Sequence, residues 1–315
     1  MATTTVAIPA QETNDLLSGA EWSPAHSREL LALTADIKAN PERYAETLRG
    51  KFLALIFEKP SLRTRVTFEV GIQSMGGHVV FLDHTQARLG ERESIADVAR
   101  NLERWVQGIV ARVYEQRVLD EMAATTDIPI VNALSDKFHP CQALADYFTL
   151  EEKFGSLKGL KLAYVGDGNN VCHSLLYLGA RLGVNLRIAT PDNYAPDADV
   201  LAASRRMAKE TKARIDLFTD PREAVEEVQA VYTDSWTSMG FEAEEKVRKE
   251  VFKAYQVNRK LMALAARDAV FMHCLPAHRG YEVTPEVLDG AQSVVLDQSE
   301  NRMYVQKAIL QTLFR

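Results

Sequence analysis

Short apolar runs alternate with amphipathic segments over most of the chain. Ten runs have the length and composition of buried strands. They are residues 52–57, 78–82, 109–114, 128–134, 160–165, 184–190, 213–218, 230–233, 269–273 and 293–296. Several segments between them repeat apolar residues at helical spacing. This alternation predicts an α/β fold of βαβ units, with mainly parallel sheets flanked by helices.

The number of strands and the chain length both favour two domains. Ten strands are more than one small open sheet usually holds, and 315 residues exceed one ordinary core. The glycine-flanked segment 155–159 follows an expected helix over residues 141–153 and is the best hinge. We therefore expect one domain over residues 1–154 and a second over residues 155–298.

Composition narrows the classes of function. A formal net charge of −6 argues against nucleic acid and against an anionic membrane surface as partners. Cys141, Cys172 and Cys274 lack metal-type spacing, as expected in a reducing compartment. The opening residues lack the positive charge of a signal or transit peptide, and no run approaches the roughly 18 apolar residues of a membrane span. We therefore expect a cytoplasmic protein.

The segment after the first expected strand has the features of an anion site. Pro60 and Ser61 stand where a helix would start, and Arg63, Thr64 and Arg65 crowd its first turn. Free backbone N–H groups at a helix N-terminus attract an anion, and guanidinium and hydroxyl groups strengthen that attraction. A capped helix with surface arginines would explain any one of these residues. Together they favour a phosphate-type site.

Other polar side chains follow other expected strands, where ligands of parallel sheets bind. We expect them to meet in the cleft between the two domains; they are Arg112, His139, Gln142, Asn170, Asp234 and Cys274. His139 could donate to a carbonyl oxygen and Gln142 could bind an amide, or His139 could simply start a helix. Asp234 and Ser238 could hold an ammonium group, or residues 234–240 could be a capped turn around a packed tryptophan.

Cys274 and the residue before it bear on metal binding. An inert, buried cysteine is the ordinary alternative to a site residue. His273 and Cys274 are adjacent on an expected strand and would point to opposite sides of it. We therefore expect no metal site there.

Residues 166–170 match a dinucleotide-binding loop only in part. Val171 stands at the position of the third glycine, and Arg187 and Ile188 occupy the end of the next strand, where an acidic ribose contact would be expected. Two asparagines at a helix start suit a carboxylate or an amino-acid backbone better. A nucleotide-dependent oxidoreductase is thus the disfavoured alternative.

Taken in order, these segments resemble the aspartate/ornithine carbamoyltransferase family, and more closely its ornithine branch. The matching segments run from residue 57 to residue 302. They are FEKPSLRTR at 57–65, ARVY at 111–114, HPCQALAD at 139–146, GDGNN at 166–170, SMG at 238–240 and HCLP at 273–276, followed by Gln298, Glu300, Asn301 and Arg302. Leu62 replaces a threonine that is common in the family.

The resemblance implies transfer of the carbamoyl group of carbamoyl phosphate to the δ-amine of L-ornithine, giving L-citrulline and phosphate in arginine metabolism. It implies that no metal or organic cofactor takes part. The first domain would bind carbamoyl phosphate and the second ornithine, and a last helix within residues 299–315 would return to the first domain. The working unit would be a homotrimer or a multiple of trimers, with active sites at subunit interfaces. A loop around residues 85–90, through Gln86 or Arg88, would reach the neighbouring subunit.

The resemblance also assigns roles to single residues. Arg112, His139 and Cys274 are expected in catalysis. Carbamoyl phosphate is expected to contact Ser61, Leu62, Arg63, Thr64, Gln86, Arg112, His139, Gln142, Cys274, Leu275 and Arg302. Ornithine is expected to contact Asn170, Asp234, Ser238, Met239 and Cys274.

Two alternatives stay open within this interpretation. Another carbamoyltransferase could act on aspartate, putrescine or an N-acylated ornithine, but the aspartate branch usually has proline at the position of Cys274. A non-enzymatic amino-acid-binding protein could keep only the cleft, but Arg63, Arg112, His139 and Cys274 are all present. The sequence does not decide between arginine synthesis and arginine breakdown.

Overall fold

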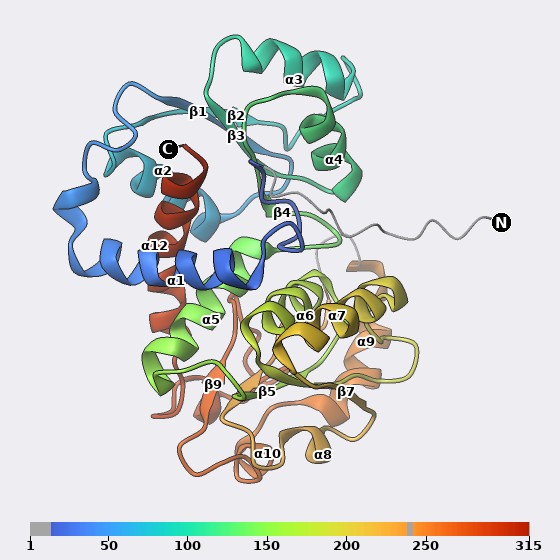
Figure 1. Cartoon of the computed structure of the whole chain (residues 1–315). Coiled ribbons are helices and arrows are strands. Elements are labelled where there is room, and N and C mark those ends of the chain that lie inside the picture. The colour runs from blue at the N-terminus through green and yellow to red at the C-terminus, as the bar shows by residue number, and fades with distance from the viewer. Residues whose placement is uncertain (1–13, 238–241, 315) are drawn as a thin grey trace. The chain divides into compact units, whose positions relative to one another are not determined.

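The computed structural model describes residues 14–237 and 242–314 (Figure 1). These residues form two compact units. The first unit comprises residues 14–144 and 301–314, and the second unit comprises residues 145–300. The chain passes between the units within helices α5 (Pro140–Phe154) and α12 (Val295–Leu313). Among the helices of the described residues, none has both the length and the hydropathy needed to cross a bilayer.

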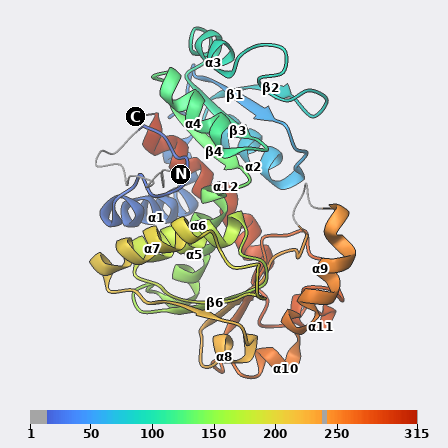
Figure 2. The ribbon, with the colours of Figure 1, turned by 90° about the vertical axis from the view of Figure 1, so that its right-hand side faces the viewer.

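The first unit is built on a four-stranded parallel sheet of order β2-β1-β3-β4. The strands are β1 (Phe52–Phe57), β2 (His78–Asp83), β3 (Gly108–Arg112) and β4 (Ile130–Leu134). Helices α3 (Ile95–Glu103) and α4 (Gln116–Thr125) pack on one face, and α1 (Pro24–Ala39), α2 (Leu62–Gln73) and α12 lie on the other (Figures 1 and 2). Because both faces are covered, the central strands are continuous apolar runs. A short 3-10 helix, η1 (Pro41–Tyr44), follows α1.

The second unit contains a five-stranded parallel sheet of order β7-β6-β5-β8-β9. Its strands are β5 (Lys161–Val165), β6 (Asn185–Ala189), β7 (Ile215–Phe218), β8 (Ala230–Tyr232) and β9 (Val270–Met272). Helices α6 (Asn170–Leu182) and α7 (Ala198–Thr211) cover one face, and α8 (Pro221–Val225) and α10 (Arg259–Met262) cover the other (Figures 1 and 2). The remaining helices are η2 (Glu242–Glu244), α9 (Glu245–Phe252), η3 (Lys253–Tyr255) and α11 (Pro285–Leu288).

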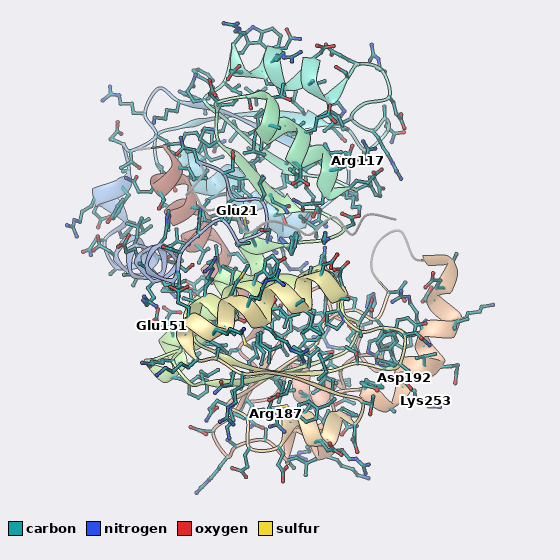
Figure 3. All side chains as sticks on the ribbon, turned by 45° about the vertical axis from the view of Figure 1, so that its right-hand side comes forward. Glu21, Arg117, Glu151, Arg187, Asp192 and Lys253 are labelled. Carbon is teal, nitrogen blue, oxygen red and sulfur yellow. The ribbon has the colours of Figure 1, made fainter. Side chains whose placement is uncertain are left out.

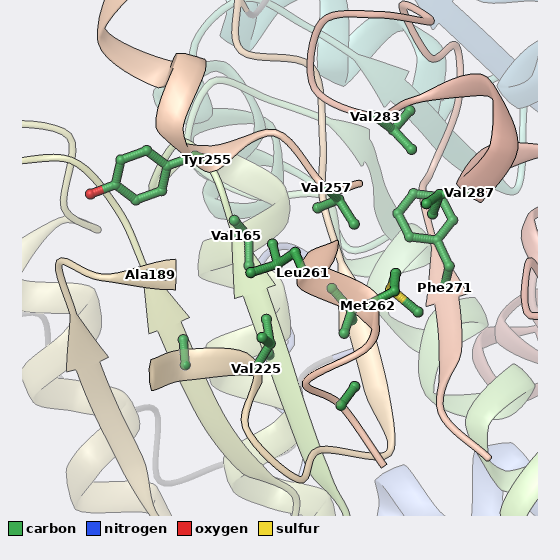
Figure 4. Packing of buried hydrophobic residues seen from close by; sticks show 14 of the residues in the cluster. Val165, Ala189, Val225, Tyr255, Val257, Leu261, Met262, Phe271, Val283 and Val287 are labelled. Carbon is green, nitrogen blue, oxygen red and sulfur yellow. The ribbon is translucent and has the colours of Figure 1, made fainter. Parts of the chain in front are cut away.

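One buried hydrophobic cluster of the second unit includes residues of α8 and α10 (Figure 4). Val225 of α8 and Leu261 of α10 belong to the same buried cluster as Val165 of β5 and Phe271 of β9. On the opposite face, α6 is buried around its whole circumference from Val171 onward. Helices therefore cover both faces of the sheet. Polar residues follow the carboxyl ends of β5, β8 and β9, and they include Asp167, Asp234 and Cys274.

Nine of the ten expected strands are confirmed, with shifts of at most two residues at their ends. The tenth, over residues 293–296, is wrong. Ser293 forms one isolated parallel bridge with Phe271, and α12 begins at Val295. The apolar run was short enough to suit either a strand or the start of a helix, and Leu296 is 76% exposed.

Candidate functional site: two clusters of polar residues

We use the name first half-site for a set of polar residues in the first unit, which are Ser61, Arg63, Thr64, Arg112, His139, Gln142 and Arg302. It begins at the turn between β1 and α2. Ser61 is extended and caps α2, because its Oγ accepts a hydrogen bond from the N–H of Thr64 at 3.3 Å. The expected helix start is therefore confirmed, and the N-terminus of α2 lies at the carboxyl end of β1. Leu62 is 76% exposed and Arg63 is half-buried in the first turn. This geometry provides free backbone N–H groups for an anion.

Arg302, a buried cation from a distant part of the chain, contacts this turn, and three further buried polar residues lie in the same unit. Arg302 of α12 donates from Nη2 to Thr64 Oγ1 at 2.7 Å, and both residues are at most 3% exposed. Arg112 ends β3 and is 6% exposed. His139, just before α5, is 5% exposed. Gln142 in the first turn of α5 is fully buried.

The charge state of His139 follows from this setting. Burial lowers the pKa of His139 well below its ordinary value, and the positive charges of Arg302 and Arg112 lower it further. His139 is therefore a neutral imidazole near pH 7. Two buried guanidinium groups and a neutral ring are suited to an anionic ligand that also carries a carbonyl oxygen.

Two charged residues in this region were missed by the sequence reasoning. Glu58 is 2% exposed, and its carboxylate accepts the N–H of Leu89 at 2.8 Å and the N–H of Tyr114 at 2.7 Å. Lys59 is 5% exposed, and its Nζ lies 4.3 Å from the centre of the Tyr114 ring. Burial, followed by the charge of Arg112, lowers the pKa of Lys59. The available signal was a Glu-Lys pair directly after a buried strand.

The loop expected to reach a neighbouring subunit is exposed in this chain. Gln86 is exposed, and Arg88 is exposed but stacks on Tyr114 with its guanidinium carbon 4.0 Å from the ring centre. Among the described residues, no hydrogen bond or ion pair links Gln86 or Arg88 to Ser61, Thr64 or Arg302. Their assignment to carbamoyl phosphate binding stays a prediction.

The second half-site, within the second unit, is centred on Asp234. This residue follows β8, and its Oδ1 accepts a hydrogen bond from Cys274 Sγ at 3.0 Å. Its Oδ2 accepts from Asn169 Nδ2 at 2.8 Å. Asn169 also caps α6, since its Oδ1 accepts the N–H groups of Val171 and Cys172. The structure thus brings together Asp234, Cys274 and the start of α6, where Asn170 is the first helical residue.

Gln298 anchors the chain next to Cys274. Its Oε1 accepts the N–H of His273 at 3.0 Å, and its Nε2 donates to Asp146 Oδ1 at 2.7 Å. Leu275, on the other side of Cys274, donates its N–H to His273 Nδ1 at 2.9 Å. These buried contacts hold the segment that carries the Cys274 thiol.

The expectation about His273 and Cys274 is wrong in its geometry. Ligand atoms of Asp234, His273 and Cys274 all lie within 4.8 Å of one another, which is within reach of one metal ion. Strand β9 ends at Met272, so the alternation of side chains along a strand does not extend to these residues. His273 has other partners, because Nδ1 accepts from Leu275 and Nε2 lies 3.3 Å from Glu282 Oε1. Metal binding through His273 would displace one of them.

Two of the expected ornithine contacts, Ser238 and Met239, lie outside the described residues. Two described residues nearby in the sequence, Trp236 and Arg248, are buried. Trp236 is 5% exposed and stacks on Phe252, with ring centres 6.0 Å apart. Arg248 of α9 is 6% exposed and donates to the carbonyl oxygen of Trp236 at 3.1 Å.

The geometry of residues 166–170 further disfavours a dinucleotide site. A Cβ added at Gly168 would come 2.3 Å from the backbone nitrogen of Pro196, so protein covers this side of the loop. Arg187 extends toward α8 (Figure 3) and donates from Nε to the carbonyl oxygen of Ala224 at 2.8 Å. A ribose contact at this strand end is therefore replaced by a structural one.

Comparison with known proteins gives a consistent result over nearly the whole chain. Residues 14–152 match the family model of the aspartate/ornithine carbamoyltransferase carbamoyl-P binding domain. Residues 158–313 match the family model of the Asp/Orn binding domain. The two matches contain the first and the second half-site, except that Arg302 lies within the second match.

Curated proteins and solved structures agree with the family models. The ornithine carbamoyltransferase of Halalkalibacterium halodurans is 46% identical over 301 residues, 95% of this chain and 94% of that protein. The Pyrococcus horikoshii ornithine carbamoyltransferase is 50% identical over 266 residues, 84% of each chain. The solved ornithine carbamoyltransferase of Pyrococcus furiosus has a TM-score of 0.91 at 44% identity, covering 96% of this chain and 97% of that one. The chain therefore belongs to the aspartate/ornithine carbamoyltransferase family.

Proposed function

We propose that this chain transfers the carbamoyl group of carbamoyl phosphate to the δ-amine of L-ornithine, forming L-citrulline and phosphate. The observation that carries the proposal is in the first half-site. There the buried Arg302 guanidinium contacts Thr64 in the first turn of α2, and burial together with the charges of Arg302 and Arg112 keeps His139 neutral. The choice of ornithine is supported by the relatives reported above, because they are named ornithine carbamoyltransferases.

Carbamoyl phosphate is assigned to the first half-site. The phosphate is held by Ser61, Arg63 and Thr64, by the N-terminus of α2 and by Arg302. Arg112 and His139 face the carbonyl oxygen, where negative charge grows as the amine attacks. One such donor is typically worth about 3 kcal/mol of barrier. Gln142 orients the carbamoyl nitrogen.

Ornithine is assigned to the second half-site. Asp234 binds the α-amino group, and Asn170 binds the α-carboxylate together with Ser238 and Met239. The δ-amine, with a pKa of about 10 in water, must lose a proton before it attacks. Cys274 and the backbone carbonyl of Leu275 hold this amine in line. The new C–N bond forms as the C–O bond to phosphate breaks. The phosphate leaves with the bonding pair and takes up the second proton of the amine.

The assembly and the cellular role complete the proposal. The working unit is a homotrimer or a multiple of trimers, in which Gln86 or Arg88 of one subunit completes the phosphate site of the next. The protein works in the cytoplasm and needs no metal or organic cofactor. One relative, from Pyrococcus furiosus, is named an anabolic ornithine carbamoyltransferase, which favours arginine biosynthesis as the role.

The test is carbamoyl transfer by the purified protein, with the product identified by mass. Carbamoyl phosphate is supplied with ornithine, N-acetylornithine, putrescine or aspartate in separate reactions. Turnover with ornithine alone supports the proposal. Turnover with another amine would keep the assignment of the first half-site and overturn that of the second. Carbamoyl phosphate binding without turnover of any amine would point to a non-enzymatic binding protein.

A further inference from the structure

Arg248 of α9 is a buried cation with several partners in the second unit. Its Nη1 donates to Asp167 Oδ2 at 2.7 Å and to the carbonyl oxygen of Trp236 at 3.1 Å. Its Nε donates to Glu244 Oε2 at 2.9 Å. The side chain is 8% exposed, and its guanidinium carbon lies 5.0 Å from the centre of the Tyr194 ring. None of the roles proposed above uses this residue.

The partners of Arg248 belong to the two loops that carry the second half-site. Asp167 lies in the loop between β5 and α6, two residues before Asn169. Tyr164 closes that loop, since its hydroxyl donates to the carbonyl oxygen of Asp167 at 2.9 Å and lies 3.2 Å from Asn169 Oδ1. Trp236 comes two residues after Asp234, in the loop that follows β8. The guanidinium group therefore joins the Asn169 loop to the Asp234 loop.

The charge balance makes this link hard to replace. The Asp167 side chain is 13% exposed, and burial raises the pKa of Asp167 while Arg248 opposes that rise. Without Arg248, a buried carboxylate would remain beside Asp234 and Glu244, whose charges raise the pKa of Asp167 further. It would then take up a proton or turn toward water, and either change would shift the loop. A lysine lacks the planar fork that reaches three acceptors at once.

We propose that Arg248 is a positioning residue for the amino-acid substrate, which sets the distance between the Asn169 loop and the Asp234 loop by clamping Asp167 to the backbone at Trp236. This inference rests on the proposed function and deepens it. Arg248 touches no reacting atom. Its removal weakens ornithine binding and leaves carbamoyl phosphate binding in the first unit unchanged.

The experiment compares four proteins by steady-state kinetics: the wild type, Arg248→Met, Arg248→Lys and the double variant Asp167→Asn/Arg248→Met. We expect Arg248→Met to raise the KM for ornithine at least tenfold, with the KM for carbamoyl phosphate within twofold of the wild type. Arg248→Lys should have a KM for ornithine between those of the wild type and Arg248→Met. In the double variant the buried partner Asp167 is replaced by a neutral amide, and the remaining partner, Glu244, is 51% exposed and can be solvated by water. The KM for ornithine should therefore recover to within threefold of the wild type.

Arg222→Met serves as the matched control. Arg222 is exposed and pairs with Asp220 at 2.7 Å in the same unit, so both KM values should stay unchanged. An unchanged ornithine KM in Arg248→Met would overturn the inference, and so would equal changes in both KM values. A double variant as impaired as Arg248→Met would also overturn it, because Asp167 would not be the partner through which Arg248 acts. Citrulline formation by the wild type tests the proposed function. The ratios of each KM in the variants to that in the wild type test the role of Arg248 separately.

Discussion

Replacing Arg302 by methionine is the sharpest test of the first half-site. The side chain is 3% exposed and contacts Thr64 Oγ1 at 2.7 Å, so methionine fills similar space without the charge or the donor. A hydrogen bond to a charged group contributes about 1.5–3 kcal/mol. Since 1.36 kcal/mol corresponds to a factor of ten, about 10- to 150-fold of carbamoyl phosphate affinity should be lost.

Stability separates this functional role from a structural one. In the free protein Arg302 contributes positive charge beside Arg112 and His139, and its removal relieves repulsion while it costs the hydrogen bond to Thr64. The loss of a hydrogen bond from a charged donor costs about 1.5–3 kcal/mol, and the relieved repulsion offsets part of that cost, so the Tm should fall by only a few degrees.

Two measurements on the same samples decide the outcome. Citrulline formation is followed at saturating ornithine over a range of carbamoyl phosphate concentrations, and unfolding is followed by calorimetry. Arg302→Lys keeps the charge and should give an intermediate KM. A normal KM for carbamoyl phosphate in Arg302→Met would refute the placement of Arg302 at the phosphate. A large loss of Tm with an unchanged KM would show that its role is structural.

Four further predictions concern three other residues. His139→Gln should lower kcat by about 100-fold through loss of a donor to the carbonyl oxygen, with a small effect on the KM for carbamoyl phosphate. Because burial and two guanidinium groups lower the pKa of His139, its protonation should not reduce wild-type kcat between pH 8 and about 6.5. A decrease of kcat in this pH range that disappears in His139→Gln would contradict this expectation. Cys274→Ser should raise the KM for ornithine while carbamoyl phosphate affinity is retained, and unchanged ornithine kinetics would remove Cys274 from the site. Glu58→Gln should destabilise the protein by about 1–3 kcal/mol in urea unfolding, because an amide cannot accept from both backbone N–H groups, and an unchanged midpoint would show that these bonds are dispensable.

Local patterns predicted most of the fold and the turn at which the first half-site begins. The apolar runs predicted nine strands because parallel sheets covered on both faces require them. The start of α2 was predicted from Pro60 and Ser61, since capping depends on residues that are neighbours in sequence. The strand expected at 293–296 was wrong, because a four-residue apolar run is too short to show the period that distinguishes a strand from a helix.

What sequence patterns left out depends on contacts between distant residues. Arg248 and Asp167 are 81 positions apart, and each alone reads as an ordinary surface charge. Glu58 gains its role only through the N–H groups of Leu89 and Tyr114, which tertiary packing brings to it. The argument against metal binding at His273 and Cys274 assumed that strand geometry extended past Met272, and strand ends are the least predictable part of a pattern.

The hydrogen bond between Thr64 and Arg302 has a consequence for biosynthesis of the protein. The two residues are 238 positions apart, and α12, which carries Arg302, is the last helix of the described chain to be translated. On the ribosome, the sheet of the first unit emerges early, whereas one of its buried cations arrives only after the whole second unit has been made. A nascent chain, or one cut before α12, would carry the Ser61 turn without Arg302. Carbamoyl phosphate would therefore be bound weakly until synthesis has passed this helix, and its binding would report completion of the chain through α12.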